Sequence, residues 1–184
     1  MLRQAGFDPD VIVSGVDETV VDLDGPSTAG ALADRKAEAV AAAAGDALVL
    51  GCDTVVEVGG RMLGQPSSAD EAAEWWRSMR NATAQVWTGH CLVDAGGESA
   101  SWIAEATVTF GDATDAEIDR YVATGEPLGA AGAFRLDGRA AAFIERIDGD
   151  PGTIHGVSIR VLRMLLRELD VEVSDLWSER GTSE

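Results

Sequence analysis

Two apolar runs that meet at a single carboxylate form the clearest hydrophobic pattern in the chain. Residues 48–52 and 54–58 have the composition of β-strands, and Asp53 lies between them. Gly59 and Gly60 follow, and they predict a hairpin turn because both central positions of such a turn require φ > 0. A lone buried charge is costly. Asp53 is therefore either an acceptor of backbone amide hydrogen bonds at a strand end, or a metal ligand or general base held on a rigid sheet.

A helix is predicted from about residue 29 to residue 44, after the segment Gly-Pro-Ser-Thr at 25–28 has broken the chain and supplied an N-cap. Leu32, Lys36 and Val40 share one face of this helix because they are spaced at i, i+4 and i+8. Lys36 thus lies on the apolar stripe. Its ammonium group either extends to the rim of the core or reaches into a cleft and meets a phosphate.

The other periodic segments predict one continuous α/β domain over residues 1–177, with a polar tail over residues 178–184. A helix that begins at a capping box carries Trp75 and Trp76, whose spacing is typical of core residues. Strands are expected over residues 10–14, 83–94, 101–110 and 143–147, and further helices over residues 114–125 and 157–169.

Composition and charge exclude several classes of protein. The chain has 184 residues, 46% of them hydrophobic, which suits a single domain with a proper core. Its net charge of −18 repels polyanions, so a nucleic acid polymer is not an expected partner. No apolar run reaches the roughly 18 residues of a membrane span, and the first residues do not resemble a signal peptide. We therefore expect a cytoplasmic protein in which Cys52 and Cys91 are buried and reduced.

The basic residues contain one further signal. Thirteen of the fourteen are arginine, and Lys36 is the single lysine. Chance can produce this bias. A site that needs a compact point charge where a planar guanidinium does not fit would also produce it.

Short motifs in a fixed order give the most specific indication of function. They are Val16-Asp-Glu18, Arg35-Lys36-Ala37, Gly51-Cys-Asp-Thr-Val-Val56, Leu63-Gly-Gln-Pro66, Thr88-Gly89, Tyr121-Val-Ala-Thr-Gly-Glu-Pro127, Ala131-Gly132 and Phe143-Ile-Glu-Arg-Ile-Asp-Gly-Asp150. Together they resemble the Maf family of nucleoside triphosphate pyrophosphatases, the septum-formation-inhibitor-like proteins. The resemblance is collinear from the first residue to about Leu169.

The resemblance implies an α/β fold of the Maf/ITPase-like kind, in which helices flank a mixed, elongated, twisted sheet and two lobes enclose a central cleft. It also implies a homodimer that hydrolyses nucleoside triphosphates to the monophosphate and diphosphate with Mg or Mn. Asp53 matches the catalytic proton acceptor and a metal ligand, and Lys36 matches a lysine that contacts the phosphates. Glu18 matches an acidic residue on the metal side of the cleft, and Gln65 and Asp137 match further substrate-binding positions.

The chain departs from the family pattern around the expected phosphate site. Gln65 replaces the lysine of a Gly-Lys-Pro motif, Asp137 replaces a glutamine and Thr153 replaces an asparagine. Family members also begin with a strand and a Ser-x-Ser-Pro-Arg-Arg loop that grips the triphosphate, whereas this sequence begins in the helix that follows. A start upstream of Met1 and a degenerate family member are the two alternatives. We expect the chain as given to be less stable and nearly inactive, and restoration of the strand and loop to rescue hydrolysis.

Three interpretations of function follow. The leading one is a metal-dependent pyrophosphatase of non-standard or modified nucleotides, with pyrimidine and methylated guanosine triphosphates both open as substrates. The second is a catalytically impaired nucleotide-binding or regulatory protein. The third is an acidic protein-interaction domain, for which the helix with Trp75 and Trp76 would supply an exposed apolar patch. The first interpretation predicts that Glu18, Lys36 and Asp53 face one cleft.

Overall fold

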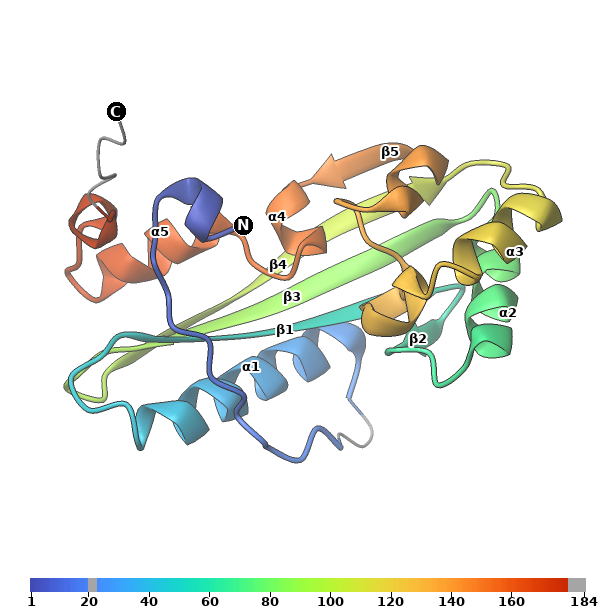
Figure 1. Ribbon diagram of the computed structural model, residues 1–184. Coiled ribbons are helices and arrows are strands. Elements are labelled where there is room, and N and C mark those ends of the chain that lie inside the picture. Colours follow the sequence, from blue (N-terminus) through green and yellow to red (C-terminus); the bar gives the residue numbers. More distant parts are fainter. Residues whose placement is uncertain (20–22, 179–184) are drawn as a thin grey trace.

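Five strands form one elongated, twisted sheet around which the molecule is built (Figure 1). The computed structural model describes residues 1–19 and 23–178. The strands lie in the order β2-β1-β3-β4-β5. Their bounds are Val49–Val58 for β1, Arg61–Leu63 for β2, Thr83–Val93 for β3, Ser99–Phe110 for β4 and Ile144–Gly149 for β5.

The α/β class and the elongated sheet are confirmed, and the strand directions add a detail. Every pairing between the five strands is antiparallel, instead of the mixture of directions that was expected. Tight turns join β1 to β2 and β3 to β4, and strands joined in this way run antiparallel.

The predicted turn and cap signals form as expected. Gly59 and Gly60 join β1 to β2 with φ values of 59° and 81°, which is the conformation that a tight hairpin requires. Thr114 and Glu117 form a reciprocal capping box at the start of α3 (Asp115–Val122). Local hydrogen bonding therefore fixes these element ends.

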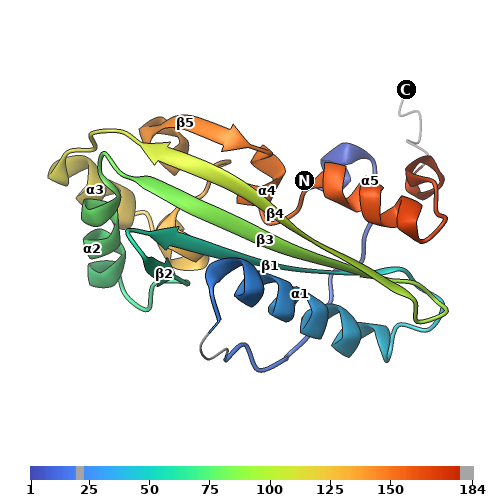
Figure 2. The same ribbon diagram turned by 180° about the vertical axis from the view of Figure 1, so that it is seen from behind.

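Helices cover both faces of the sheet (Figures 1 and 2). Residue parity decides on which face of the sheet a side chain lies. Strand pairing preserves parity, so odd-numbered residues of β1, β3 and β4 face α1, and even-numbered residues face the other helices. The helices are α1 (Gly25–Ala41), α2 (Ala69–Met79), α3, α4 (Pro151–Ile154) and α5 (Ile159–Glu168). Short 3-10 turns are η1 (Arg3–Ala5), η2 (Glu126–Gly129), η3 (Ala131–Ala133), η4 (Arg139–Phe143) and η5 (Val173–Leu176).

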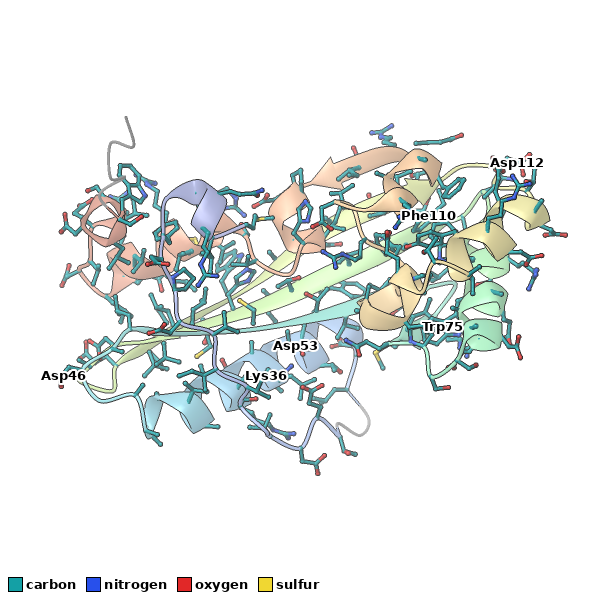
Figure 3. The ribbon with its side chains drawn as sticks, in the orientation of Figure 1. Lys36, Asp46, Asp53, Trp75, Phe110 and Asp112 are labelled. Carbon is teal, nitrogen blue, oxygen red and sulfur yellow. The ribbon has the colours of Figure 1, made fainter. Side chains whose placement is uncertain are left out.

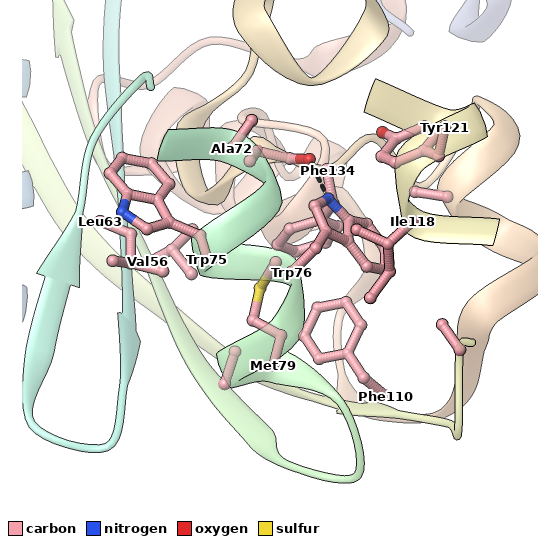
Figure 4. Close-up of a cluster of buried hydrophobic side chains, with 14 of the residues drawn as sticks. Val56, Leu63, Ala72, Trp75, Trp76, Met79, Phe110, Ile118, Tyr121 and Phe134 are labelled. Carbon is pink, nitrogen blue, oxygen red and sulfur yellow. Dashed lines mark hydrogen bonds between the residues drawn. The ribbon is translucent and has the colours of Figure 1, made fainter. Parts of the chain in front are cut away.

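An aromatic core packs α2 and α3 against the even face at one end of the sheet (Figure 4). Trp76 makes edge-to-face contacts with Phe110 and Tyr121, with ring centroids 5.6 and 4.9 Å apart. Its indole Nε1 donates a hydrogen bond to the carbonyl of Ala133 at 2.8 Å. Trp75 is buried as well. Because both tryptophans belong to the core, this helix presents no apolar patch of the kind that an interaction domain would need.

A second core lies under α5 on the same sheet face, at the opposite end of the long strands (Figure 1). It buries Leu162, Leu165 and Leu166 of α5 together with Leu92 of β3 and Phe7. The two cores thus occupy the two ends of one face.

The structure corrects two predictions about elements: one expected strand does not form, and one helix begins earlier. No strand forms over residues 10–14, where Val11 and Val13 are 84% and 91% exposed. β-Branched residues alone do not make a strand when no neighbouring strand supplies hydrogen bonds. Helix α1 begins at Gly25 instead of near residue 29, because Asp24 is its N-cap and accepts a hydrogen bond from the amide of Ser27.

The ends of the chain add two observations. Ser178, the first residue of the expected polar tail, donates a backbone hydrogen bond to the carbonyl of Gly6 at 2.7 Å. The rest of that tail, like residues 20–22 of the acidic loop, lies outside the described residues. Within residues 1–19 and 23–178, the structure contains no helix with the length and apolar character needed to cross a bilayer.

Candidate active site

Two glycines bring α1 into direct contact with the sheet. A Cβ atom on Gly51 of β1 would lie 2.4 Å from the carbonyl oxygen of Ala33, and one on Gly89 of β3 would lie 2.2 Å from that of Ala29. Both distances are far below van der Waals contact, so only glycine permits this approach. The helix backbone therefore lies close enough for a side chain of α1 to reach β1.

The ammonium group of Lys36 contacts two carboxylates, those of Asp53 and Glu18. Figure 3 shows Lys36 and Asp53 where α1 lies against β1. Lys36 Nζ lies 2.6 Å from Asp53 Oδ1 and 2.8 Å from Glu18 Oε1. Asp53 projects from the odd face of β1, and Glu18 comes from the segment that precedes α1. The structure thus brings together the three residues that the sequence predicts to share one cleft.

Burial and charge shape the protonation of this cluster. Burial raises the pKa of Asp53 and outweighs the opposing effect of the Lys36 hydrogen bond. Burial alone would lower the pKa of Lys36, but hydrogen bonds to Asp53 and Glu18 raise it overall. Lys36 therefore stays an ammonium ion at neutral pH, and Asp53 is a stronger base than an aspartate in water.

The cluster has suitable donors for a hard divalent cation, although few of them. Glu18 and Asp53 contribute carboxylate oxygens, the ligand type that Mg²⁺ prefers. Within the described residues, no group of three or more His, Cys, Asp or Glu side chains is placed to hold a metal. Two carboxylates suit an ion that keeps several waters and takes its other ligands from substrate phosphates.

A hollow of about 250 Å³ lies on the opposite face of β1. Thr54, the next residue after Asp53, lines it, because successive strand residues point to opposite faces. Apolar side chains and loop backbone form the walls, and polar side chains gather at residues 135, 137 and 155. The lining residues are Thr54, Val56, Val86, Gly129, Ala130, Ala131, Phe134, Arg135, Leu136, Asp137, Ile154, His155 and Gly156.

Hydroxyl groups fix the floor of this hollow. Thr88 Oγ1 donates to the carbonyl of Thr153 at 2.6 Å, so Thr54 Oγ1 is the donor in its 2.8 Å hydrogen bond to Thr88. Beneath them, His90 Nε2 accepts the Ser158 amide at 2.9 Å. Burial lowers the pKa of His90, which keeps the ring neutral and able to accept this bond.

The loop that carries Asp137 is closed by Glu126. This carboxylate accepts hydrogen bonds from the backbone amide of Arg139 at 2.8 Å and from its guanidinium Nη1 at 3.2 Å. Gly138 leaves room for the contact, because a Cβ there would lie 2.3 Å from Glu126 Oε1. Arg135 pairs with Asp137 through two hydrogen bonds of 3.1 and 3.0 Å and lowers the pKa of that carboxyl.

The predicted site residues therefore occupy different places. Asp137 lines the hollow, on the other side of the strand from Asp53. Gln65 is exposed after β2 and is not among the residues that line the hollow in the described part of the chain. Sequence reasoning missed Thr54 and His155. The position of Thr54 beside a candidate catalytic aspartate was the available signal, whereas nothing in the sequence marks His155.

Both thiols are protonated at neutral pH. Cys52 and Cys91 are free cysteines on opposite faces of the sheet, and Cys52 is only partly buried, where both were expected to be buried. Burial raises the pKa of Cys52 to about 12 and that of Cys91 to about 11, so neither forms a thiolate at neutral pH.

Comparison with known proteins shows the family of the chain. The sequence pattern of the family described as "Maf-like protein" matches residues 1–169. A protein of Streptomyces avermitilis is 50% identical over 184 residues, which cover 98% of this chain and 89% of the relative. A protein of Salinispora tropica is 47% identical, covering 99% and 83%, and one of Mycolicibacterium smegmatis is 42% identical, covering 98% and 92%. Each is named nucleoside triphosphate pyrophosphatase. The chain belongs to the Maf family.

Proposed function

We propose that the protein hydrolyses nucleoside triphosphates to the monophosphate and diphosphate, with Asp53 as the base that orients and deprotonates the attacking water. The observation that carries this proposal is the contact of one ammonium with two carboxylates, Lys36 with Asp53 and Glu18, and a hollow of about 250 Å³ lies on the other face of the same strand. The expectation of a hydrolase acting on acid anhydrides is confirmed, because relatives up to 50% identical are named nucleoside triphosphate pyrophosphatase.

The cluster supplies the groups that attack on the α-phosphorus needs. The raised pKa of Asp53 makes its carboxylate a suitable general base. Lys36 neutralises charge on the leaving diphosphate. Glu18 and Asp53 would hold a divalent cation, Mg or Mn, and such an ion polarises phosphoryl oxygens and screens their charge when bound.

The edge of β1 connects the two halves of the proposed site. Strand β2 pairs only with residues 56–58 of β1. Beside Asp53 and Thr54, no strand of the described part of the chain lies along that edge. A nucleotide can therefore place its base in the hollow behind Thr54 and pass its phosphates around the edge to Asp53. Asp137 would then contact the base, and Gln65 would contact the phosphates.

Three finer features belong to the same proposal and rest on the family resemblance. They are a preference for non-standard or modified nucleotides, a homodimer and a cytoplasmic location. Light scattering on the purified protein measures the oligomeric state, and two protomers per particle is the expected result.

Release of diphosphate from a panel of nucleotides tests the proposed function. We expect whatever release occurs to require Mg or Mn, to stop in excess chelator and to recover when metal is added back. Canonical, methylated and deaminated triphosphates form the panel. Nucleotide binding without any release would favour the impaired regulatory protein instead, and full turnover in excess chelator would remove the metal from the mechanism.

A further inference from the structure

The position of Lys36 has a consequence beyond phosphate binding. Its ammonium contacts one oxygen of each carboxylate, Asp53 Oδ1 and Glu18 Oε1. The Lys36 side chain is 21% exposed and that of Asp53 is 12% exposed. Solvent screens this pair only partly, so the ammonium is held firmly in place.

A divalent cation that bridges Asp53 and Glu18 from the position of the ammonium needs the same two oxygens. Mg²⁺ binds carboxylate oxygens at about 2.0–2.1 Å, which places it where the Lys36 ammonium lies. Two cations cannot occupy this place together, because their repulsion is strong at a partly buried site. Metal binding between these two oxygens therefore requires Lys36 to leave them.

A triphosphate can draw the Lys36 ammonium away from the two carboxylates. Its oxygens offer the ammonium new anionic partners, and a nucleotide carries its own divalent cation to the carboxylates. Without the triphosphate, the apparent metal affinity equals the intrinsic affinity multiplied by the fraction of molecules in which Lys36 is displaced. The identity of the residue suits such an exchange, since an ammonium is a compact point charge, whereas an arginine would grip a carboxylate with a bidentate fork. Lys36 is the single lysine of the chain.

We propose that Lys36 occupies the metal site in the free protein, so that a divalent cation binds Glu18 and Asp53 only together with a triphosphate, which draws the ammonium away. The part played by the triphosphate rests on the proposed function. The competition between lysine and metal does not, because it depends only on the three side chains.

Direct Mn²⁺ binding to the free protein, measured by electron paramagnetic resonance, tests this competition without turnover. We expect weak Mn²⁺ binding by the wild type and binding at least about tenfold tighter by K36Q, because the substitution frees both carboxylates. R35Q is the matched control, since it removes one positive charge from an exposed neighbour whose guanidinium contacts the Thr19 carbonyl. Adding E18Q to K36Q should abolish the gain.

A second measurement needs no variant. With a non-hydrolysable triphosphate analogue, the wild type should bind Mn²⁺ in a ternary complex. Its spectrum should differ from that of Mn²⁺ with the protein alone and from that of Mn²⁺ with the analogue alone. If the wild type released no diphosphate from any nucleotide while Mn²⁺ binding followed the expected pattern, the proposed function would be overturned and the competition would stand. Equal Mn²⁺ affinities of K36Q and R35Q, or tight Mn²⁺ binding by the wild type without the analogue, would overturn the inference.

Discussion

At the scale of single residues, the site depends on positions that carry no functional group. Gly51 and Gly89 allow α1 to touch the sheet, and this contact lets Lys36 reach Asp53. Among the described residues, Asp53 accepts a hydrogen bond from the Lys36 ammonium and not from a backbone amide at a strand end. Its catalytic role stays a prediction.

Gly51→Ala should harm both stability and the site. The added Cβ would force α1 away from β1, and we expect a loss of about 1–3 kcal/mol in the free energy of unfolding. Lys36 would move away from Asp53, so diphosphate release should fall as well. Urea denaturation and the release assay measure the two effects. Gly64→Ala is the control, because nothing lies within 4 Å of its Cβ position. A Gly51→Ala protein as stable as this control would contradict the packing argument.

At the scale of elements, hydrogen bonds between its two ends close the loop from Gly125 to Arg139. Residues 129–131 and 134–137 of this loop line the hollow. Glu126 closes the ends of the loop through Arg139. Burial, and next the charge of Glu126, raise the pKa of Tyr121, which keeps the phenol neutral beside the carboxylate. A bond between residues thirteen positions apart is not readable from local sequence.

Glu126→Ala should loosen this loop and weaken nucleotide binding. We expect KM to rise about tenfold with a smaller change in kcat, because the hollow would contribute binding shared by the ground and transition states. Steady-state kinetics on one triphosphate measures this split. Glu74→Ala is the control, since Glu74 forms only an exposed ion pair with Arg61 at 3.4 Å. A fall in kcat with unchanged KM would assign Glu126 to the chemistry instead.

At the scale of the whole molecule, β1 divides the candidate site in two. Local patterns predicted the hairpin turn, the capped helices and the core tryptophans. These features depend on hydrogen bonds and apolar spacing among residues that are close together in the sequence. The family resemblance predicted that Glu18, Lys36 and Asp53 would meet. Sequence reasoning could not predict that Asp53 and Asp137 lie on opposite faces, since this depends on strand parity and on how a distant loop packs.

The central claim is that water activated by Asp53 attacks the α-phosphorus, and the fate of the water oxygen tests it most directly. Hydrolysis in water enriched in heavy oxygen, followed by mass spectrometry of both products, reports which phosphorus was attacked. The account predicts label in the nucleoside monophosphate, none in the diphosphate, and turnover lowered by about 10²–10⁴-fold in D53N. Label in the diphosphate, or D53N turnover equal to that of the wild type, would contradict it.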